Sequence, residues 1–237
     1  MKKPIFLLIA AATVLTSAYL GYRWFNQHGN RTVRVFEWLR DPSAHGDWSI
    51  KAGERCGEAP FLMPTDGFIG YLWGDSFRAG HAHQGLDIFG GSDLNQTPVL
   101  APYSGYLTRK PDWKSSVILR VPEDPLVPGR QIWVYFTHMA DANGHSYISP
   151  EFSPGIEEQY IEAGTLLGYQ GNYSGDTNNP VGIHLHMSIV KDDGQGNFLN
   201  ELKIENTIDP SPYLGLPVNG KINRTEIPIC LRELNQP

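Results

Sequence analysis

VGIHLHMSIV, residues 181–190, has an apolar side chain at every second position from Ile183 to Ile189, with His184 and His186 between them. In an extended chain, successive side chains point to opposite faces, so both imidazoles lie on one face of a predicted strand. Two imidazoles side by side on a strand suit metal binding and acid–base catalysis. The alternative is a half-buried strand whose solvent-facing side carries histidines by chance. Partners elsewhere in the chain must decide between the two.

A first partner lies upstream, in GHAHQGLDIFGG (80–91), where His83 and Asp87 are four residues apart. The glycines argue against a helix, and in an extended segment an even spacing keeps both side chains on one face. One imidazole and one carboxylate from here, with one imidazole from the 181–190 strand, would form a three-ligand zinc site with an open position. That is the pattern of catalytic zinc rather than structural zinc. His81 is a competing ligand candidate.

A second partner is WVYFTHMAD (133–141), in which His138 ends an apolar strand. A histidine at a strand end that faces a cleft is a candidate proton carrier. The alternative is an ordinary surface histidine at a strand terminus.

Composition favours a β-rich globule. The 237 residues include 25 Gly and 18 Pro, and 19% are charged. Short runs of strand-forming residues alternate with turn residues, which predicts an antiparallel sheet. These runs are 67–73, 85–89, 97–102, 115–121, 131–138, 164–169 and 183–190. Residues 154–164 are the best helix-period segment after Cys56, and 140–160 are predicted to form a long loop.

The charge of the chain argues against nucleic acid as a partner. The net charge is −6, and residues 1–25 contain three basic residues and no acid, so the remainder has 16 basic against 25 acidic residues. Electrostatic binding of nucleic acid needs a basic face, which a remainder with a net charge of −9 does not favour.

The N-terminal segment differs in character from the rest. Two lysines precede an uncharged run from Pro4 to Tyr22, 19 residues long. This length just spans a bilayer, which predicts a signal anchor over 1–25. A cleaved signal peptide is the alternative, although Thr16-Ser17-Ala18 is a poor cleavage site. Residues 26–55 are polar and mixed and are predicted to form a linker. Either reading exports the rest of the chain.

Cys56 and Cys230 are the two cysteines. In an exported protein such a pair favours a disulfide, with two buried thiols as the alternative.

The three histidine motifs together, in this order and spacing, resemble the lysostaphin/LytM-type zinc endopeptidases that cut cell-wall peptides. The resemblance covers about residues 60–215 and includes PTDGFIGYLWGDSF (64–77), TPVLAPYSGYL (97–107), AGTLLGYQGNYSG (163–175) and IDPSPYL (208–214). It implies a mainly β fold, an antiparallel sheet or sandwich of the duplicated hybrid motif type with few short helices. The corresponding domain would occupy residues 56–237.

The resemblance also implies a site and an activity. His83, Asp87 and His186 match the ligands of one zinc ion per chain, and His138 and His184 match the catalytic pair. The implied function is hydrolysis of peptidoglycan stem or bridge peptides outside the cytoplasm. The chain would be anchored in the membrane, or secreted or periplasmic if the N-terminal segment is cleaved; a regulatory protein partner is left open. The alternative function is a non-catalytic LytM-type module that binds or activates a cell-wall amidase.

Overall fold

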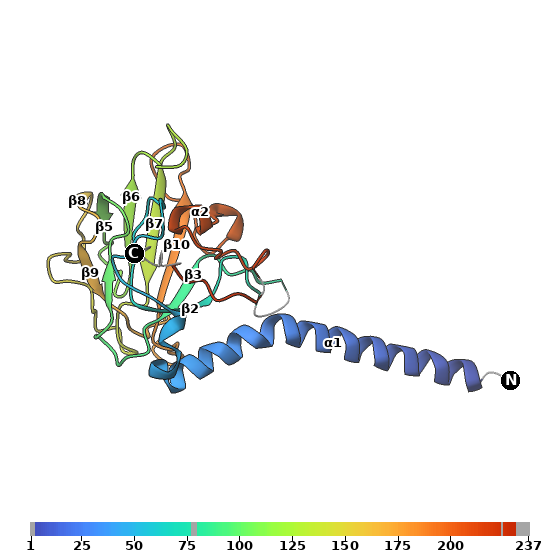
Figure 1. Cartoon of the computed structure of the whole chain (residues 1–237). Helices are drawn as coiled ribbons and strands as arrows, with labels where there is room; N and C mark the ends of the chain where they lie inside the picture. Colours follow the sequence, from blue (N-terminus) through green and yellow to red (C-terminus); the bar gives the residue numbers. More distant parts are fainter. Residues whose placement is uncertain (1–2, 77–79, 224, 231–237) are drawn as a thin grey trace, which may run out of the picture.

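The computed structural model describes residues 3–76, 80–223 and 225–230, without the side chains of residues 3–12 and 22–30. Figure 1 shows a β-domain from which one long helix projects. In chain order the elements are α1 (Lys3–Arg40), η1 (Pro42–Trp48), β1 (Ser49–Ile50), β2 (Gly67–Tyr71), β3 (Leu86–Phe89), β4 (Pro98–Leu100), β5 (Gly105–Thr108), β6 (Val117–Val121), β7 (Ile132–Thr137), β8 (Gln159–Ile161), β9 (Leu166–Tyr169), β10 (Leu185–Lys191), η2 (Ile204–Asn206), β11 (Thr207–Ile208) and α2 (Ser211–Leu214).

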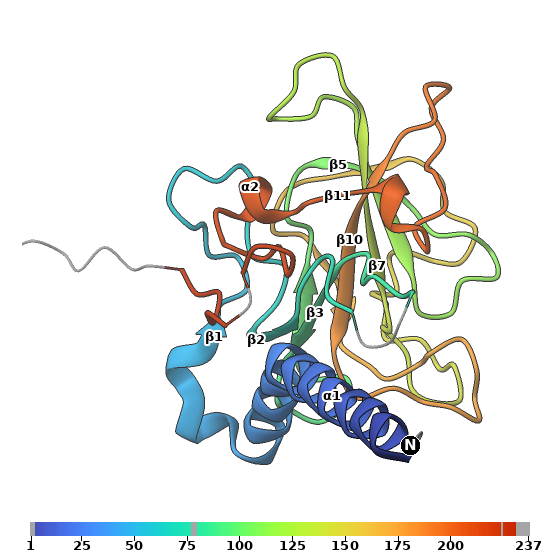
Figure 2. The same ribbon diagram turned by 90° about the vertical axis from the view of Figure 1, so that its right-hand side faces the viewer.

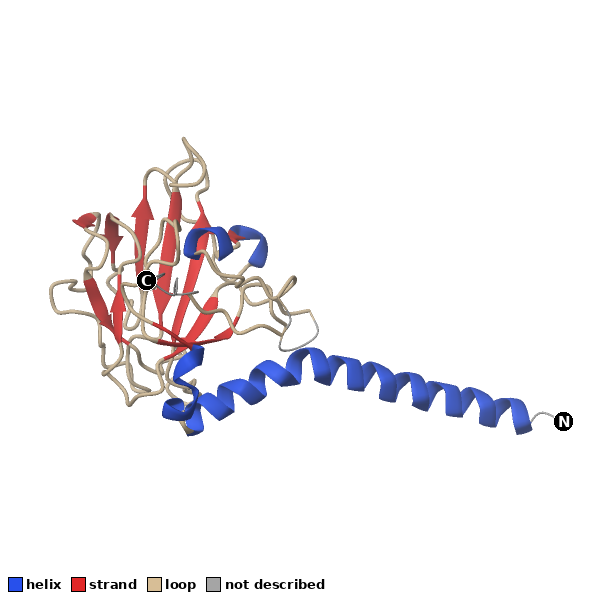
Figure 3. Cartoon of the chain, viewed as in Figure 1, coloured by secondary structure: helices blue, strands red, loops and turns tan. Residues whose placement is uncertain are grey.

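The strands form two sheets, and every pairing between named strands is antiparallel. The large sheet has the order β1-β2-β3-β10-β7-β6-β5-β8, with β11 also paired to β10, and the small sheet pairs β4 with β9. Val99 of β4 and Leu167 of β9 lie in the same core as Leu107 and Val134 of the large sheet. The prediction of a mainly antiparallel β fold is therefore confirmed, and apart from α1 the helices are short (Figure 3).

Each of the seven predicted strand segments contains a strand. The weak helix-period segment 154–164 contains a strand, β8, which pairs with β5. Its pattern is only about two turns long, and a nucleus that short is unstable without tertiary packing, so the edge of the sheet determines its conformation.

Strand β10 is buried on both faces. Leu185, Met187 and Ile189 lie in the main core, as the alternating pattern predicts. On the opposite face, Val190 packs with Trp133 in a second apolar cluster. The solvent-facing side expected for this strand is therefore covered along its second half.

Helix α1 is longer than the predicted anchor. It continues without a break to Arg40, and η1 and β1 follow, so residues 26–50 are mostly helix and not the predicted linker. The difference has a tertiary cause: Val35 and Trp38 pack on Phe68 and Phe89, and Trp38 Nε1 donates to the Phe89 carbonyl at 2.8 Å. Figure 2 shows this end of α1 beside β2 and β3.

Within the described residues, no helix has the length and apolar character that a membrane span requires. The structure does not describe the side chains of residues 1–12 and 22–25 of the predicted segment. The signal anchor or signal peptide over residues 1–25 therefore stays a prediction.

The predicted disulfide between Cys56 and Cys230 is present, with a Cα–Cα distance of 5.1 Å. It joins positions 174 residues apart and attaches the end of the described chain to the domain.

Candidate metal centre

The order of three strands brings the histidine motifs together. Strand β10, which carries the 181–190 motif, lies between β3 and β7 in the sheet. The motif of residues 80–91 includes β3, and the motif of residues 133–141 overlaps β7. His186 is in register with Asp87 on β3 and with Thr137 on β7. His138 directly follows Thr137. Sequence spacing could not give this order, because it depends on which strands pair.

His83, Asp87 and His186 form a compact group. Their ligand atoms all lie within 4.8 Å of one another. Asp87 Oδ1 is 3.1 Å from His83 Nε2 and 2.8 Å from His186 Nδ1, and these two ring nitrogens are 3.2 Å apart. His83 and Asp87 are buried and His186 is half-buried. Two imidazole nitrogens and one carboxylate oxygen are the donor set of a catalytic zinc site, so the residues fit this ion.

Backbone carbonyls orient three of the imidazoles. His83 Nδ1 donates to Leu72 O at 3.0 Å, His138 Nδ1 to Tyr173 O at 2.6 Å, and His184 Nδ1 to Gly182 O at 2.7 Å. A carbonyl oxygen can only accept, so the Nδ1 of each of these rings carries hydrogen. In a neutral ring this leaves Nε2 with a free lone pair, as a metal ligand or a proton acceptor requires.

His138 and His184 lie beside the group. Their ring centroids are 4.5 Å apart, and the centroid of His138 is 6.2 Å from that of His186. His184 Nε2 is 3.5 Å from Asp87 Oδ1, and its ring stacks on Phe89 at a centroid distance of 5.0 Å. Both imidazoles can therefore reach a molecule held at the three-ligand group.

The electrostatics favour a cation at the group. Burial alone would raise the pKa of Asp87, but the imidazoles of His83 and His184 outweigh it and hold that pKa well below its usual value. Burial also works against charge on His83, yet the Asp87 carboxylate raises the pKa of His83. The carboxylate thus attracts positive charge, which a proton or a metal ion can supply.

His138 is electrostatically different. Burial lowers the pKa of His138 to about 3, and the nearby imidazoles of His184 and His186 add to this effect. At neutral pH its ring is therefore uncharged, with its Nε2 lone pair available. Its backbone has a φ of 74°, which is uncommon for a residue with a side chain.

The structure brings together all five predicted site residues: His83, Asp87, His138, His184 and His186. The competing candidate His81 is not part of the three-ligand group. Sequence reasoning missed the carbonyls of Leu72, Tyr173 and Gly182, because a backbone acceptor leaves no residue-type signal. The 140–160 loop also contributes no residue to the group.

No family model matches the sequence, and no curated protein matches it. Among solved structures, the catalytic domain of the antimicrobial peptidase lysostaphin from Staphylococcus simulans aligns at 20% identity and a TM-score of 0.41, over 62% of this chain and 90% of that chain. A catalytic-domain variant of the prophage-encoded M23 protein EnpA from Enterococcus faecalis aligns at 18% identity and a TM-score of 0.38, over 64% of this chain and 96% of that chain.

Lysostaphin and EnpA belong to the peptidase family that the sequence motifs resemble. Helicobacter pylori Csd3 also aligns, at 14% identity and a TM-score of 0.38, over 65% of this chain and 33% of that chain. All three alignments lie below 25% identity and below a TM-score of 0.5.

Proposed function

We propose that this chain is a zinc-dependent endopeptidase that hydrolyses peptide bonds in peptidoglycan stem or bridge peptides. The observation that carries the proposal is the convergence of His83, Asp87 and His186 within 4.8 Å, with His138 and His184 beside them. A structural zinc site would be closed by a fourth protein ligand, whereas three ligands leave a position for a reacting molecule.

His83, Asp87 and His186 would hold the ion. Zinc, when bound there, supplies a Lewis acid that acidifies water and polarises a peptide carbonyl. The three ligands come from the loop before β3, from β3 and from β10, so the sheet fixes two of them in register. His83, the ligand in the loop, has its ring orientation fixed by the hydrogen bond from its Nδ1 to Leu72 O.

His138 and His184 would handle protons. Each donates Nδ1–H to a carbonyl, so in the neutral state each Nε2 can accept a proton from the attacking water. Once protonated, the same Nε2–H can hydrogen-bond the developing oxyanion or pass the proton to the leaving amine. The two imidazoles would share these tasks, because both lie next to the three-ligand group.

The substrate class follows from the resemblance of the three histidine motifs to enzymes that cut cell-wall peptides. Peptidoglycan lies outside the cytoplasm, so the enzyme must be exported. We assign export to residues 1–25, which would then either anchor the chain in the membrane or be removed. The disulfide is consistent with an oxidising compartment.

Digestion of peptidoglycan tests the proposal. The full chain, loaded with zinc, is incubated with crosslinked peptidoglycans of different bridge chemistry, and released fragments are identified by mass spectrometry. New amine ends are expected, and His138→Ala should abolish them. His145→Ala is the matched control, because His145 is exposed, pairs with Asp141 and is not one of the five residues of the candidate site. It should cleave like the unchanged chain.

Three results would speak against the proposal. Zinc bound at one per chain with no cleavage of any peptidoglycan would remove this substrate class. Cleavage that survives His138→Ala would remove the assigned role of that histidine. If the chain neither binds zinc nor cleaves peptidoglycan, the alternative that remains is a non-catalytic module that binds or activates an amidase.

A further inference from the structure

Of the three candidate ligands, His83 is the one that does not lie on a strand, so its position depends on a turn. Its backbone N–H donates to Asp75 O at 2.7 Å, and its carbonyl accepts from Gly74 N at 2.7 Å. Its ring Nδ1 donates to Leu72 O at 3.0 Å. All three hydrogen bonds go to residues 72–75. Any shift of this turn therefore moves the ring nitrogen that faces Asp87 and His186.

The side chain of Asp75 closes the turn. Asp75 Oδ2 accepts from the backbone N–H of Leu72 at 2.7 Å, and the N–H of Asp75 donates back to the Leu72 carbonyl at 3.1 Å. The backbone of Gly220 lies against this carboxylate, since a Cβ on Gly220 would come within 2.2 Å of Asp75 Oδ1. The carboxylate is thus largely removed from water and needs a cation nearby.

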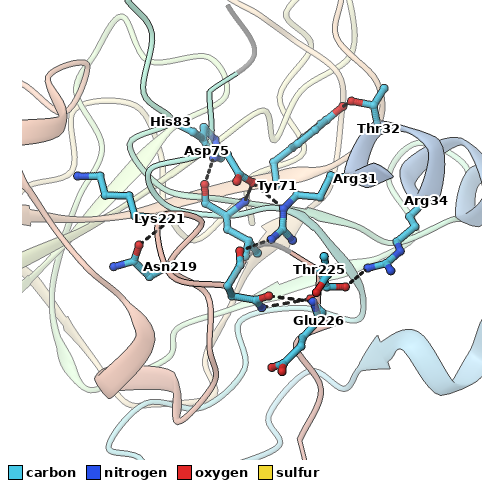
Figure 4. Close-up of polar contacts among 12 residues, drawn as sticks. Arg31, Thr32, Arg34, Tyr71, Asp75, His83, Asn219, Lys221, Thr225 and Glu226 are labelled. Atoms are coloured by element: carbon cyan, nitrogen blue, oxygen red, sulfur yellow. Dashed lines mark hydrogen bonds and ion pairs between the residues drawn. The ribbon is translucent and has the colours of Figure 1, made fainter. Parts of the chain in front are cut away.

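That cation comes from α1. Arg31 Nε is 3.2 Å from Asp75 Oδ2, with the side chain of Arg31 buried and that of Asp75 half-buried. Another nitrogen of the same guanidinium donates to the carbonyl of Asn223 at 2.6 Å, in the C-terminal segment (residues 219–223 and 225–230). Figure 4 shows Arg31 reaching from the helix towards Asp75, with His83 next to Asp75. Burial lowers the pKa of Arg31 and the Asp75 carboxylate opposes this change.

We infer that Arg31 is a positioning residue for His83, acting through Asp75. Helix α1 would hold the 72–75 turn by this ion pair, and the turn would hold His83 in line with Asp87 and His186. The inference rests on the proposed function, because it takes His83 to be a zinc ligand. It makes α1 part of the metal centre, although the helix contributes no ligand. Partners of metal ligands typically change metal affinity 10- to 100-fold when they are removed.

Zinc affinity of the full chain tests the inference. Competition with a chelator gives the dissociation constant, and the absorption spectrum of the cobalt(II) form reports ligand geometry directly. Arg31→Met should weaken zinc binding about tenfold or more and alter the cobalt spectrum. Arg31→Lys, which keeps a cation near Asp75, should restore part of the affinity. Circular dichroism confirms that each metal-free variant is folded at the temperature of the measurement.

Arg34→Met is the matched control. Arg34 lies one turn further along α1 and donates to the carbonyl of Thr225, so this variant removes a cation and a contact to the C-terminal segment without touching Asp75. Its zinc affinity and cobalt spectrum should equal those of the unchanged chain. Equal losses in both variants would overturn the inference, since any loosening of α1 would then suffice.

Asp75→Asn approaches the same link from the other side. It keeps an oxygen for the Leu72 amide but removes the negative charge, and it is also the variant to use if Arg31→Met does not fold. It should weaken zinc binding, and the double variant should lose no more than the larger single loss, because both act through one contact. Unchanged zinc affinity in Asp75→Asn, or in a folded Arg31→Met, would overturn the inference alone. If the chain without substitutions binds no zinc, both the inference and the proposed metal centre are overturned.

Discussion

His138 combines an uncommon backbone conformation with a neutral, buried imidazole. Its φ of 74° costs free energy for any residue with a Cβ, and such positions often occur at functional sites. Its carbonyl accepts from Ala140 N at 2.8 Å, and the close approach of Gly171 leaves no room to relax, since a Cβ there would lie 2.5 Å from His138 O. The surrounding backbone therefore holds His138 in this conformation.

A comparison of two truncations should reveal this strain. Both His138→Ala and His138→Gly remove the ring, but glycine tolerates a positive φ. His138→Gly should therefore be more stable than His138→Ala by about 0.5–1 kcal/mol, the reverse of the usual order for the two residues. Denaturant unfolding of the metal-free chain measures the difference. A more stable alanine variant would contradict the left-handed backbone at this position.

At the scale of elements, the contact between β3 and β10 fixes the distance between ligands. Gly85 precedes β3, and a Cβ on it would come within 2.2 Å of the Met187 carbonyl and 2.9 Å of His186 Nε2. Both neighbours belong to β10. The absence of a side chain at position 85 thus allows His186 to lie against the strand that carries Asp87.

Gly85→Ala should therefore damage both fold and site. We expect a loss of about 1–3 kcal/mol in the free energy of unfolding, together with weaker zinc binding. Gly182→Ala is the matched control, since its Cβ would meet only Phe89, at 3.9 Å. Thermal unfolding and zinc titration measure the two effects. Equal behaviour of the two variants would show that β3 and β10 can separate without consequence.

The turn that follows β10 should make the stability of the fold depend on pH. Asp192 is partly desolvated, which alone would raise its pKa, but hydrogen bonds from Trp133, Gln131 and Gly194 outweigh this and lower the pKa of Asp192. A carboxylate with a lowered folded-state pKa stabilises the fold above its unfolded pKa of about 4, and this stabilisation is lost as the pH falls through the folded pKa.

Asp192→Asn should therefore be less stable than the unchanged chain at pH 6, and the difference should shrink as the pH falls below about 4. Urea unfolding across this pH range tests it. A difference that stays constant with pH would mean that packing, not the charge of Asp192, is responsible.

Local patterns predicted much of the sheet and singled out the five residues that the structure brings together at the candidate site. Leu185, Met187 and Ile189 alternate with the histidines, and this pattern alone orients β10 in the core. The link from Arg31 to Asp75 could not be predicted, because it joins a helix to a turn 44 positions away and neither residue belongs to a motif. The helix over residues 26–40, within the predicted linker 26–55, could not be predicted for the same reason: the apolar contacts of Val35 and Trp38 are with β2 and β3.

At the scale of the whole molecule, the disulfide and the C-terminal segment hold α1 against the domain. Ile227 packs on the cluster that contains Val35 and Trp38, and the carbonyls of Asn223 and Thr225 accept from Arg31 and Arg34. Cys230 then attaches this segment to Cys56. Helix, segment and domain thus depend on one another.

Replacing both cysteines by alanine should lower the free energy of unfolding by about 2–5 kcal/mol. Hydrogen exchange should also speed up more at residues 31–40 of α1 than at β10, because β10 keeps its neighbours β3 and β7. Mass spectrometry of exchanged peptides measures the two regions, with the oxidised chain as reference. A uniform increase would argue that the disulfide stabilises the domain without a special effect on the helix.

The same arrangement sets the order of events during biosynthesis. The ribosome makes α1 before the β-domain, yet Arg31 and Arg34 bind carbonyls that are made among the last residues described, and Cys56 must wait for Cys230. The helix can therefore dock fully only after translation has passed these residues. If Arg31 positions His83 as inferred, a nascent or truncated chain that ends before Asn223 would lack a finished metal site.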